Sequence, residues 1–301
     1  MSASRRYFKI VILLLIILAI MAAWKFYSPA NIPASSEHLI LSTPPEPLEN
    51  ERDPQSPETY TMKDKPVRGV PILMYHKISS DPKVGGLTYR VLPEDFEWQM
   101  RYLKDNGYHT VNLGDVYNFY HNGGGLPDKP VVITIDDGYK DNYYNAFPIL
   151  KKYGHTATIF IVTNTVGGKN EFDTKVHLQP ECEMLSWEEI REMDAAGITI
   201  GAHTLDHVHL ARISVKEAER QLIESKKRLE QELNHEVKYF CYPYGEYSRS
   251  VLELVKKCGY LAATSVEPGL ASSGQNPLLY SRIAVQGNFD HKRFIQELNR
   301  Y

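Results

Sequence analysis

The chain has 301 residues, of which 43% are hydrophobic and 24% charged, and this balance is typical of a globular protein with a full core. Its formal net charge of -3 argues against a nucleic acid partner, because phosphate backbones are bound by basic stripes. Three cysteines without a CxxC spacing indicate neither a disulfide framework nor a thiolate zinc site.

Residues 1–27 have the pattern of a signal anchor. Arg5, Arg6 and Lys9 precede an uninterrupted apolar run over residues 10–24, which aromatic residues follow. The run is somewhat shorter than the roughly 20 residues that cross a bilayer, and the aromatic side chains extend it at the interface. Because no A-x-A site or lipobox cysteine is present, an uncleaved anchor is favoured over a cleaved signal peptide. The basic N-terminus predicts an extracytoplasmic chain that is anchored to the cell membrane, or secreted if the segment is cleaved.

The next segment, residues 28–68, is rich in Pro, Glu, Ser and Asp and has too few apolar residues to form a core. Such a composition predicts a disordered linker. From residue 69 to residue 301 the sequence consists of short β-branched runs that alternate with amphipathic stretches, as expected of one folded domain.

Strands and helices alternate along this domain. The predicted strands lie at residues 70–74, 110–111, 131–135, 157–162, 198–203, 238–242, 261–265 and 281–285. The predicted helices begin near Pro93, cover 146–153, begin at Ser186, Ser214 and Ser248, and close the chain. Ser214 and Glu217 have the spacing of a capping box, and Val215 begins the predicted apolar face of that helix. This β-α order implies a parallel sheet, and without an early GxGxxG a barrel is favoured over an open sheet.

Polar residues follow four of the predicted strands. They are His76, the pair Asp136 and Asp137, His203, and the segment 242–245 (Y-P-Y-G). In parallel α/β folds the carboxyl ends of the strands meet on one face, where functional groups collect. We therefore expect these four groups to share one rim.

Two histidines in this set have a metal-ligand spacing. His203 and His207 are four residues apart, so on a helical turn both imidazoles would lie on one side and share a cation, whereas His209 is a weaker candidate. A carboxylate from Asp136 or Asp137 would complete an open catalytic site. The other carboxylate would then take the proton of a metal-bound water as that water attacks a carbonyl.

Each of these motifs also has an ordinary interpretation. An Asp-Asp-Gly sequence is commonly a solvated turn, in which Gly138 supplies the tight backbone bend. An HxxxH pair arises by chance on surface helices, and a histidine such as His76 is commonly just hydrogen-bonded. Their joint occurrence at four strand ends favours the functional interpretation.

These residues resemble the polysaccharide deacetylases, which carry the NodB-homology domain of carbohydrate esterase family four. The family motif T-F-D-D-G is similar to T-I-D-D-G at 134–138, H-[ST]-x-x-H matches 203–207, and R-x-P-Y is similar to C-Y-P-Y at 241–244. The resemblance covers about residues 70–290. It implies a distorted (β/α)7 barrel that follows the N-terminal membrane anchor and linker.

The resemblance also implies a role for each matching residue. Asp136 would be the general base, and Asp137, His203 and His207 would hold a divalent metal, usually zinc, with cobalt or nickel also accepted. Tyr244 would donate its backbone N–H to the oxyanion that forms during the reaction.

The sequence departs from the common family pattern at three places. Cys241 stands where the third motif has arginine, no tryptophan motif occurs at 262–267, and the stretch 279–285 lacks the histidine of the fifth motif. Instead, P-I-L-M-Y-H at 71–76 is similar to the N-terminal segment of the poly-β-1,6-N-acetylglucosamine deacetylase branch, in which a permuted histidine is the general acid. His76 is assigned that role by the resemblance.

The leading hypothesis is therefore a metal-dependent hydrolase that removes N-acetyl groups from N-acetylglucosamine residues of an extracellular or cell-wall polysaccharide. The branch that it resembles would place it in biofilm carbohydrate metabolism. Two alternatives stay open: a catalytically weak carbohydrate-binding scaffold of an exopolysaccharide system, and an O-acetyl esterase that acts on xylan or peptidoglycan.

Overall fold

The computed structural model describes residues 69–175 and 177–300. The predicted anchor and linker, residues 1–27 and 28–68, lie outside the described residues. Among the residues that are described, no helix is both long enough and apolar enough to cross a membrane.

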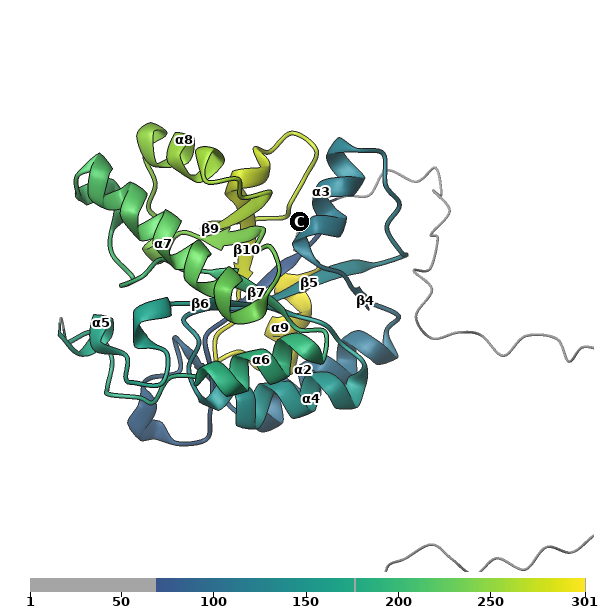
Figure 1. The fold of residues 1–301 in the computed structure, drawn as a ribbon. Helices are drawn as coiled ribbons and strands as arrows, with labels where there is room; N and C mark the ends of the chain where they lie inside the picture. Colours follow the sequence, from purple (N-terminus) through teal and green to yellow (C-terminus); the bar gives the residue numbers. More distant parts are fainter. Residues whose placement is uncertain (1–68, 176, 301) are drawn as a thin grey trace, which may run out of the picture. The chain divides into compact units, whose positions relative to one another are not determined.

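A closed parallel barrel forms the centre of the described domain (Figure 1). Its strands are β1 (Ile72–Tyr75), β5 (Pro130–Ile135), β6 (Thr158–Ile161), β7 (Thr199–Ala202), β8 (Tyr239–Cys241), β9 (Ala262–Pro268) and β10 (Tyr280–Ala284). The barrel closes because β1 pairs in parallel with both β10 and β5, with Leu73 opposite Ile283 and Ile72 opposite Val132. The prediction of a seven-stranded (β/α) barrel is confirmed.

Three short strands lie outside this ring. They are β4 (His109–Thr110), which extends the sheet from β5, and β2 (Lys77–Ile78) and β3 (Arg90–Val91), which pair with each other. β2 and β3 follow β1 closely, so they build part of the rim at its carboxyl end.

Helices surround the barrel. They are α2 (Pro93–Asp105), α3 (Leu113–His121), α4 (Phe147–Tyr153), α5 (Glu171–Thr174), α6 (Trp187–Ala195), α7 (Val215–Leu233), α8 (Arg249–Lys257) and α9 (His291–Leu298). In Figure 1, α2, α4 and α6 lie on one side of the barrel, while α7 and α8 pack together on another.

The helix boundaries have local causes. Ser214 caps α7 by accepting a hydrogen bond from Glu217 N, but Glu217 does not return the bond of a capping box, because its carboxylate binds Arg220 instead. Val215, predicted on the apolar face, is 58% exposed, so this part of the prediction is wrong. Ser186 and Glu189 do form a complete capping box at α6.

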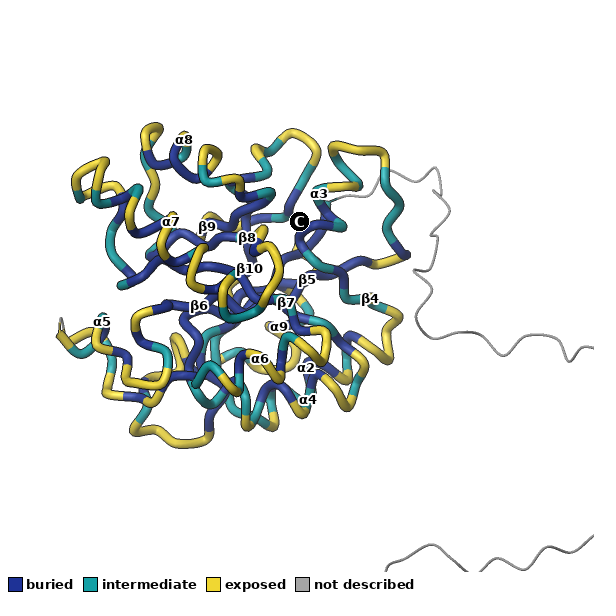
Figure 2. Tube along the Cα trace, in the orientation of Figure 1, coloured by how far each residue is buried: buried dark blue, intermediate teal, exposed yellow. Residues whose placement is uncertain are grey.

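The core of the described domain has two main parts, one inside the barrel and one between the barrel and its helices, and a small third cluster of Tyr139, Cys182 and Met184. Ile72, Val132, Phe160 and Tyr280 belong to the inner part, together with Leu113 of α3. All six residues of β5 are buried, as expected for a strand covered on both faces. Figure 2 shows buried residues along most of the other barrel strands, while the last three residues of β9 are exposed. Apolar packing therefore fills the barrel below the polar residues at the carboxyl ends of its strands.

Candidate active site

The strand β5 ends in a turn that separates the two adjacent carboxylates. Asp137 has φ = 77° and Gly138 has φ = 81°, so two consecutive residues adopt left-handed conformations directly after the strand. Such a conformation is unfavourable for aspartate and persists where surrounding contacts fix it, which is common at functional sites. A Cβ at position 138 would lie 3.0 Å from Ile161 Cδ1, so the close contact and the positive φ together favour glycine there.

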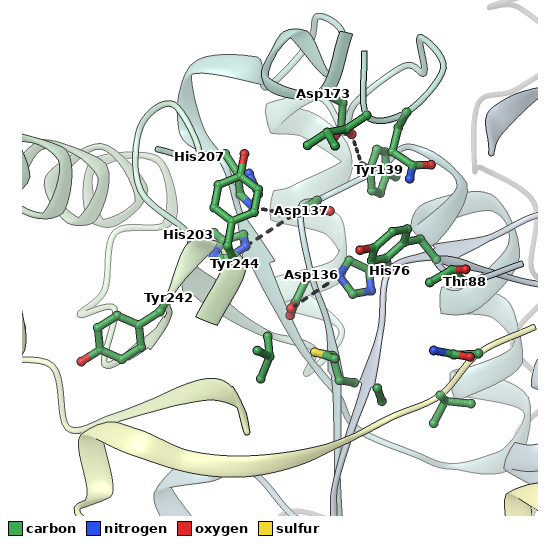
Figure 3. Close-up of a pocket in the computed structure, with 18 residues that line it drawn as sticks. His76, Thr88, Asp136, Asp137, Tyr139, Asp173, His203, His207, Tyr242 and Tyr244 are labelled. Carbon is green, nitrogen blue, oxygen red and sulfur yellow. Dashed lines mark hydrogen bonds and ion pairs between the residues drawn. The ribbon is translucent and has the colours of Figure 1, made fainter. Parts of the chain in front are cut away.

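Asp137, His203 and His207 lie together at the carboxyl end of the barrel (Figure 3). The Nε2 atoms of both histidines lie 3.4 Å from Asp137 Oδ1. Two ligands that each lie about 2.0–2.1 Å from a tetrahedral zinc ion are separated by roughly 3.3–3.4 Å. Asp137 Oδ1 is buried and has no hydrogen-bond partner among the described residues. Since a buried, unpartnered carboxylate oxygen is costly, this trio fits a divalent cation.

The two histidines do not lie on a helical turn, so that part of the prediction is wrong. β7 ends at Ala202, and residues 204–206 form a tight turn in which Thr204 and His207 have φ values of 67° and 54°. The hydroxyl of Thr204 accepts a hydrogen bond from His207 N at 2.9 Å. This turn brings the two imidazole rings within 4.7 Å of each other, centroid to centroid.

A hydrogen bond to the backbone of β8 orients the His203 ring. Its Nδ1 donates to the backbone oxygen of Cys241 at 2.7 Å, which leaves Nε2 directed at Asp137. Such support of a ligating imidazole fixes its tautomer and orientation.

Burial and neighbouring groups shift the pKa values of the two histidines in opposite directions. Burial lowers the pKa of His207 to about 3, so its imidazole is neutral and offers a lone pair. Burial also acts to lower the pKa of His203, but contacts with Cys241 and Asp137 outweigh it and raise that pKa. For Asp137, the neighbouring imidazoles outweigh burial and hold the pKa below its usual value. Cation binding would therefore displace a proton from His203.

A second grouping, Asp136 with His203 and Cys241, is also compact. Here Arg282 donates two hydrogen bonds to the carboxylate of Asp136, at 2.8 and 2.7 Å. A guanidinium this close opposes a metal ion, and His203 Nδ1 is already bonded to a backbone oxygen. The trio with Asp137 is the better metal site.

Arg282 is a residue that the sequence analysis missed. Its side chain is 0% exposed, and it projects from β10 to bind Asp136 as a bidentate pair, where the family's third motif would supply arginine from the position of Cys241. Its other hydrogen bonds go to Ser265 O, Thr134 Oγ1 and Cys241 Sγ. The thiol of Cys241 lies 3.5 Å from Asp136 Oδ2 and completes this packing. A lone arginine in the segment SRIAV is the one local sign of a buried charge, and it does not identify the partner.

The pair fixes the charge of Asp136. Burial acts to raise the pKa of Asp136, but the charge and hydrogen bonds of Arg282 outweigh it and lower that pKa. Asp136 is therefore ionised at neutral pH, as a proton acceptor must be.

Replacing Arg282 with methionine should destabilise the protein by about 3–5 kcal/mol, because the buried carboxylate loses its counter-charge. Urea unfolding at pH 7 measures this loss. In the double variant Arg282→Met/Asp136→Asn no unpaired charge remains, so part of the stability should return. A single variant within 1 kcal/mol of the wild type would contradict this role of the pair.

His76 lies on the other side of Asp136. It follows β1 directly, and its Nε2 is 4.0 Å from Asp136 Oδ2. The Tyr89 ring meets the His76 ring edge-on at 5.1 Å. The side chain of His76 is 18% exposed, so the imidazole is accessible from the cavity while it packs against Tyr89.

Tyr244 completes the rim. It lies in the 3₁₀ turn Pro243–Gly245 after β8, and its ring meets the His207 ring at 4.6 Å. The cavity has a volume of about 520 Å³ and is lined by all six predicted site residues: His76, Asp136, Asp137, His203, His207 and Tyr244. His209 does not line it.

The chain is similar to known proteins over most of its length. The family described as polysaccharide deacetylase matches residues 123–263. A protein named for that family, YxkH of Bacillus subtilis (strain 168), is 34% identical over 231 residues, which cover 77% of this chain and 76% of the relative. The chain belongs to the polysaccharide deacetylase family. It is thus an enzyme of a hydrolase family, which argues against the scaffold alternative.

Two further relatives extend the match. The poly-β-1,6-N-acetyl-D-glucosamine N-deacetylase of Staphylococcus aureus (strain MRSA252) is 30% identical over 213 residues, which cover 67% of this chain and 70% of that protein. The structure of the Streptococcus pyogenes deacetylase PplD, in complex with acetate, is 28% identical with a TM-score of 0.67, over 76% of this chain and 98% of that one. This deacetylase therefore shares its fold over nearly the whole of that solved domain.

Proposed function

We propose that this deacetylase hydrolyses the N-acetyl groups of N-acetylglucosamine residues in an extracellular or cell-wall polysaccharide. The observation that carries the proposal is the shared cavity, in which an open Asp-His-His trio lies beside an ionised carboxylate that is not one of its ligands. The staphylococcal relative supports this substrate class, since its name states that activity.

Asp137, His203 and His207 would hold the cation. A divalent ion, most simply zinc with cobalt or nickel as substitutes, would polarise the acetyl carbonyl and acidify the attacking water. Because the water is acidified, a carboxylate with a lowered pKa suffices as its base.

Asp136 would take a proton from the attacking water. Arg282 fixes its two oxygens within the barrel, so the carboxylate faces the cavity in one orientation. The Tyr244 backbone N–H would donate to the oxygen on which negative charge grows.

His76 would finish the reaction by donating a proton to the departing nitrogen. The amide C–N bond breaks, water contributes the new carboxylate oxygen, and the products are acetate and a sugar amine. At 4.0 Å from Asp136, His76 is close enough to act on the same bound acetamide.

Replacing His76 with alanine is expected to reduce kcat by roughly a hundredfold, the usual scale of general acid catalysis. Steady-state acetate release from an N-acetylglucosamine oligomer measures it. His121→Ala, which changes a histidine at the end of α3 outside the cavity, is the matched control. An unchanged kcat in His76→Ala would assign the acid to another group.

A substrate panel tests the proposed function. Acetate release is compared between β-1,6- and β-1,4-linked N-acetylglucosamine oligomers and O-acetylated xylan or peptidoglycan, with residues 69–301 as the enzyme. Release from an N-acetylated glycan with little from the esters supports the proposal. The reverse preference would replace it with the esterase alternative.

The location follows from the sequence alone and is part of this proposal. Residues 1–27 would anchor the enzyme to the cell membrane and residues 28–68 would hold the domain away from it, outside the cytoplasm. Cell fractionation should find the full chain with the membranes, and a soluble chain in the culture medium that has lost residues 1–27 would indicate cleavage instead.

A further inference from the structure

Tyr244 has a backbone conformation that residues other than glycine rarely adopt. Its φ and ψ are 59° and 6°, in the left-handed region. The next residue, Gly245, has φ = 68°, and a Cβ there would lie 2.3 Å from Val266 Cγ2 on β9. The turn is thus pressed against the barrel, and a strained turn of this kind persists only where neighbouring contacts fix it.

The ring of His209 supplies such a contact. It stacks on the Tyr244 ring with centroids 3.7 Å apart and planes only 9° apart. The Tyr244 ring also meets His207, so it lies against two histidines of the same loop, as Figure 3 shows for His207. The orientation of the tyrosine therefore depends on the loop that carries two of the candidate metal ligands.

His209 is itself fixed by the segment that it supports. Its Nδ1 lies 3.1 Å from Glu246 Oε2, and the other carboxylate oxygen of Glu246 binds Arg212. Glu246 comes two residues after Tyr244, while Arg212 comes three residues after His209. The stack and the ion pair thus join the loop after β7 to the turn after β8 at two adjacent points. We call His209, Arg212 and Glu246 the loop clamp.

We propose that His209 is a positioning residue, which by stacking on the Tyr244 ring keeps the backbone N–H of Tyr244 aligned with the Asp137–His203–His207 site, while the rest of the loop clamp supports the His209 ring. This inference rests on the proposed function, since it assigns Tyr244 to the growing oxyanion. His209 is not a metal ligand in this account, because its Nδ1 faces Glu246 and its side chain lies outside the cavity. Loss of one oxyanion donor costs about a hundredfold to a thousandfold in kcat, so a loosened donor should cost less.

The test compares His209→Ala with His209→Phe. Alanine removes the ring, whereas phenylalanine keeps a flat ring against Tyr244 and removes only the bond to Glu246. For His209→Ala we expect kcat to fall by about tenfold or more, with KM within twofold, and with metal content and melting temperature as in the wild type. His209→Phe should recover kcat to within about threefold of the wild type, because stacking is the larger contact.

His235→Ala is the matched control. His235 also pairs with a carboxylate, Asp194, with Nε2 to Oδ2 at 2.9 Å, but it lies in the connection between α7 and β8, which enters the opposite end of the barrel. This variant should match the wild type in every measurement.

A second readout does not depend on turnover. Acetate, the product of the proposed reaction, would accept a hydrogen bond from the backbone N–H of Tyr244. Calorimetric titration of metal-loaded protein should therefore show weaker acetate binding in His209→Ala than in the wild type. A wild-type kcat in His209→Ala would overturn the proposal. So would a loss of kcat that His209→Phe does not restore, or a loss of kcat that is explained by a loss of metal. If the wild type releases no acetate from any glycan, the proposed function fails. Equal affinities of the wild type and His209→Ala for acetate would separately overturn the positioning role of His209.

Discussion

Replacing Asp136 with asparagine is expected to lower kcat by about a thousandfold while the metal content stays at the wild-type level. Asparagine keeps the shape of the side chain but cannot accept the proton of the attacking water. The metal content should not change, because the candidate ligand atoms belong to Asp137, His203 and His207 and not to Asp136. Acetate release and metal analysis on the same preparation measure both effects.

This variant needs a check on folding, because Arg282 would be left as a buried, unpaired charge. Urea unfolding should show the protein still folded under assay conditions. Asp105→Asn, at the exposed end of α2, is the control for an aspartate outside the site. A near-normal rate in folded Asp136→Asn would remove Asp136 as the base.

Replacing His203 with alanine should abolish both metal binding and turnover. One of three ligands disappears, and the hydrogen bond to Cys241 O that orients it disappears too. We expect less than a tenth of the wild-type metal content and an acetate release below about one hundredth, since His203 supports the chemistry through the cation. The variants Asp136→Asn and His203→Ala thus differ in metal content although both lose activity.

The control for this experiment is again His121→Ala, in α3, which should keep full metal content and rate. A His203→Ala protein that retains one equivalent of divalent metal would show that the ion binds elsewhere.

The barrel and the membership of the trio could be predicted from sequence because both depend on local patterns. Alternating apolar runs and helices fix the order of the elements, and groups that follow parallel strands meet at one end. The four-residue spacing of His203 and His207 singled out two imidazoles that the structure brings together, although the local geometry is not the predicted helical turn. Two left-handed residues, Thr204 and His207, bring the imidazoles together where a helix was expected.

Arg282 could not be predicted in the same way, because its partnership is set by closure of the barrel. It lies on β10 and meets Asp136, which directly follows β5 and lies 146 positions earlier in the chain. Only the closed ring directs both side chains inward to the same point. No local spacing in the sequence indicates that contact. The sequence shows only that position 241 has cysteine in place of the motif arginine, whereas in the structure Arg282 supplies the guanidinium that pairs with Asp136.

The helix α3 was missed for a different reason. No element was predicted between residues 111 and 131, since glycines and aromatic residues obscure the apolar period there. Asn112 and Asp115 form a complete capping box that opens this helix, and their spacing was the available signal. Leu113 then packs into the inner core of the barrel.

The most direct test of the central claim is a metal titration of acetate release. Residues 69–301 are stripped with a chelator, assayed on an N-acetylglucosamine oligomer, and then given back zinc in measured steps. The stripped protein should release no acetate, and the rate should return in full at one ion per chain. Undiminished acetate release from protein shown to contain no metal would contradict the central claim.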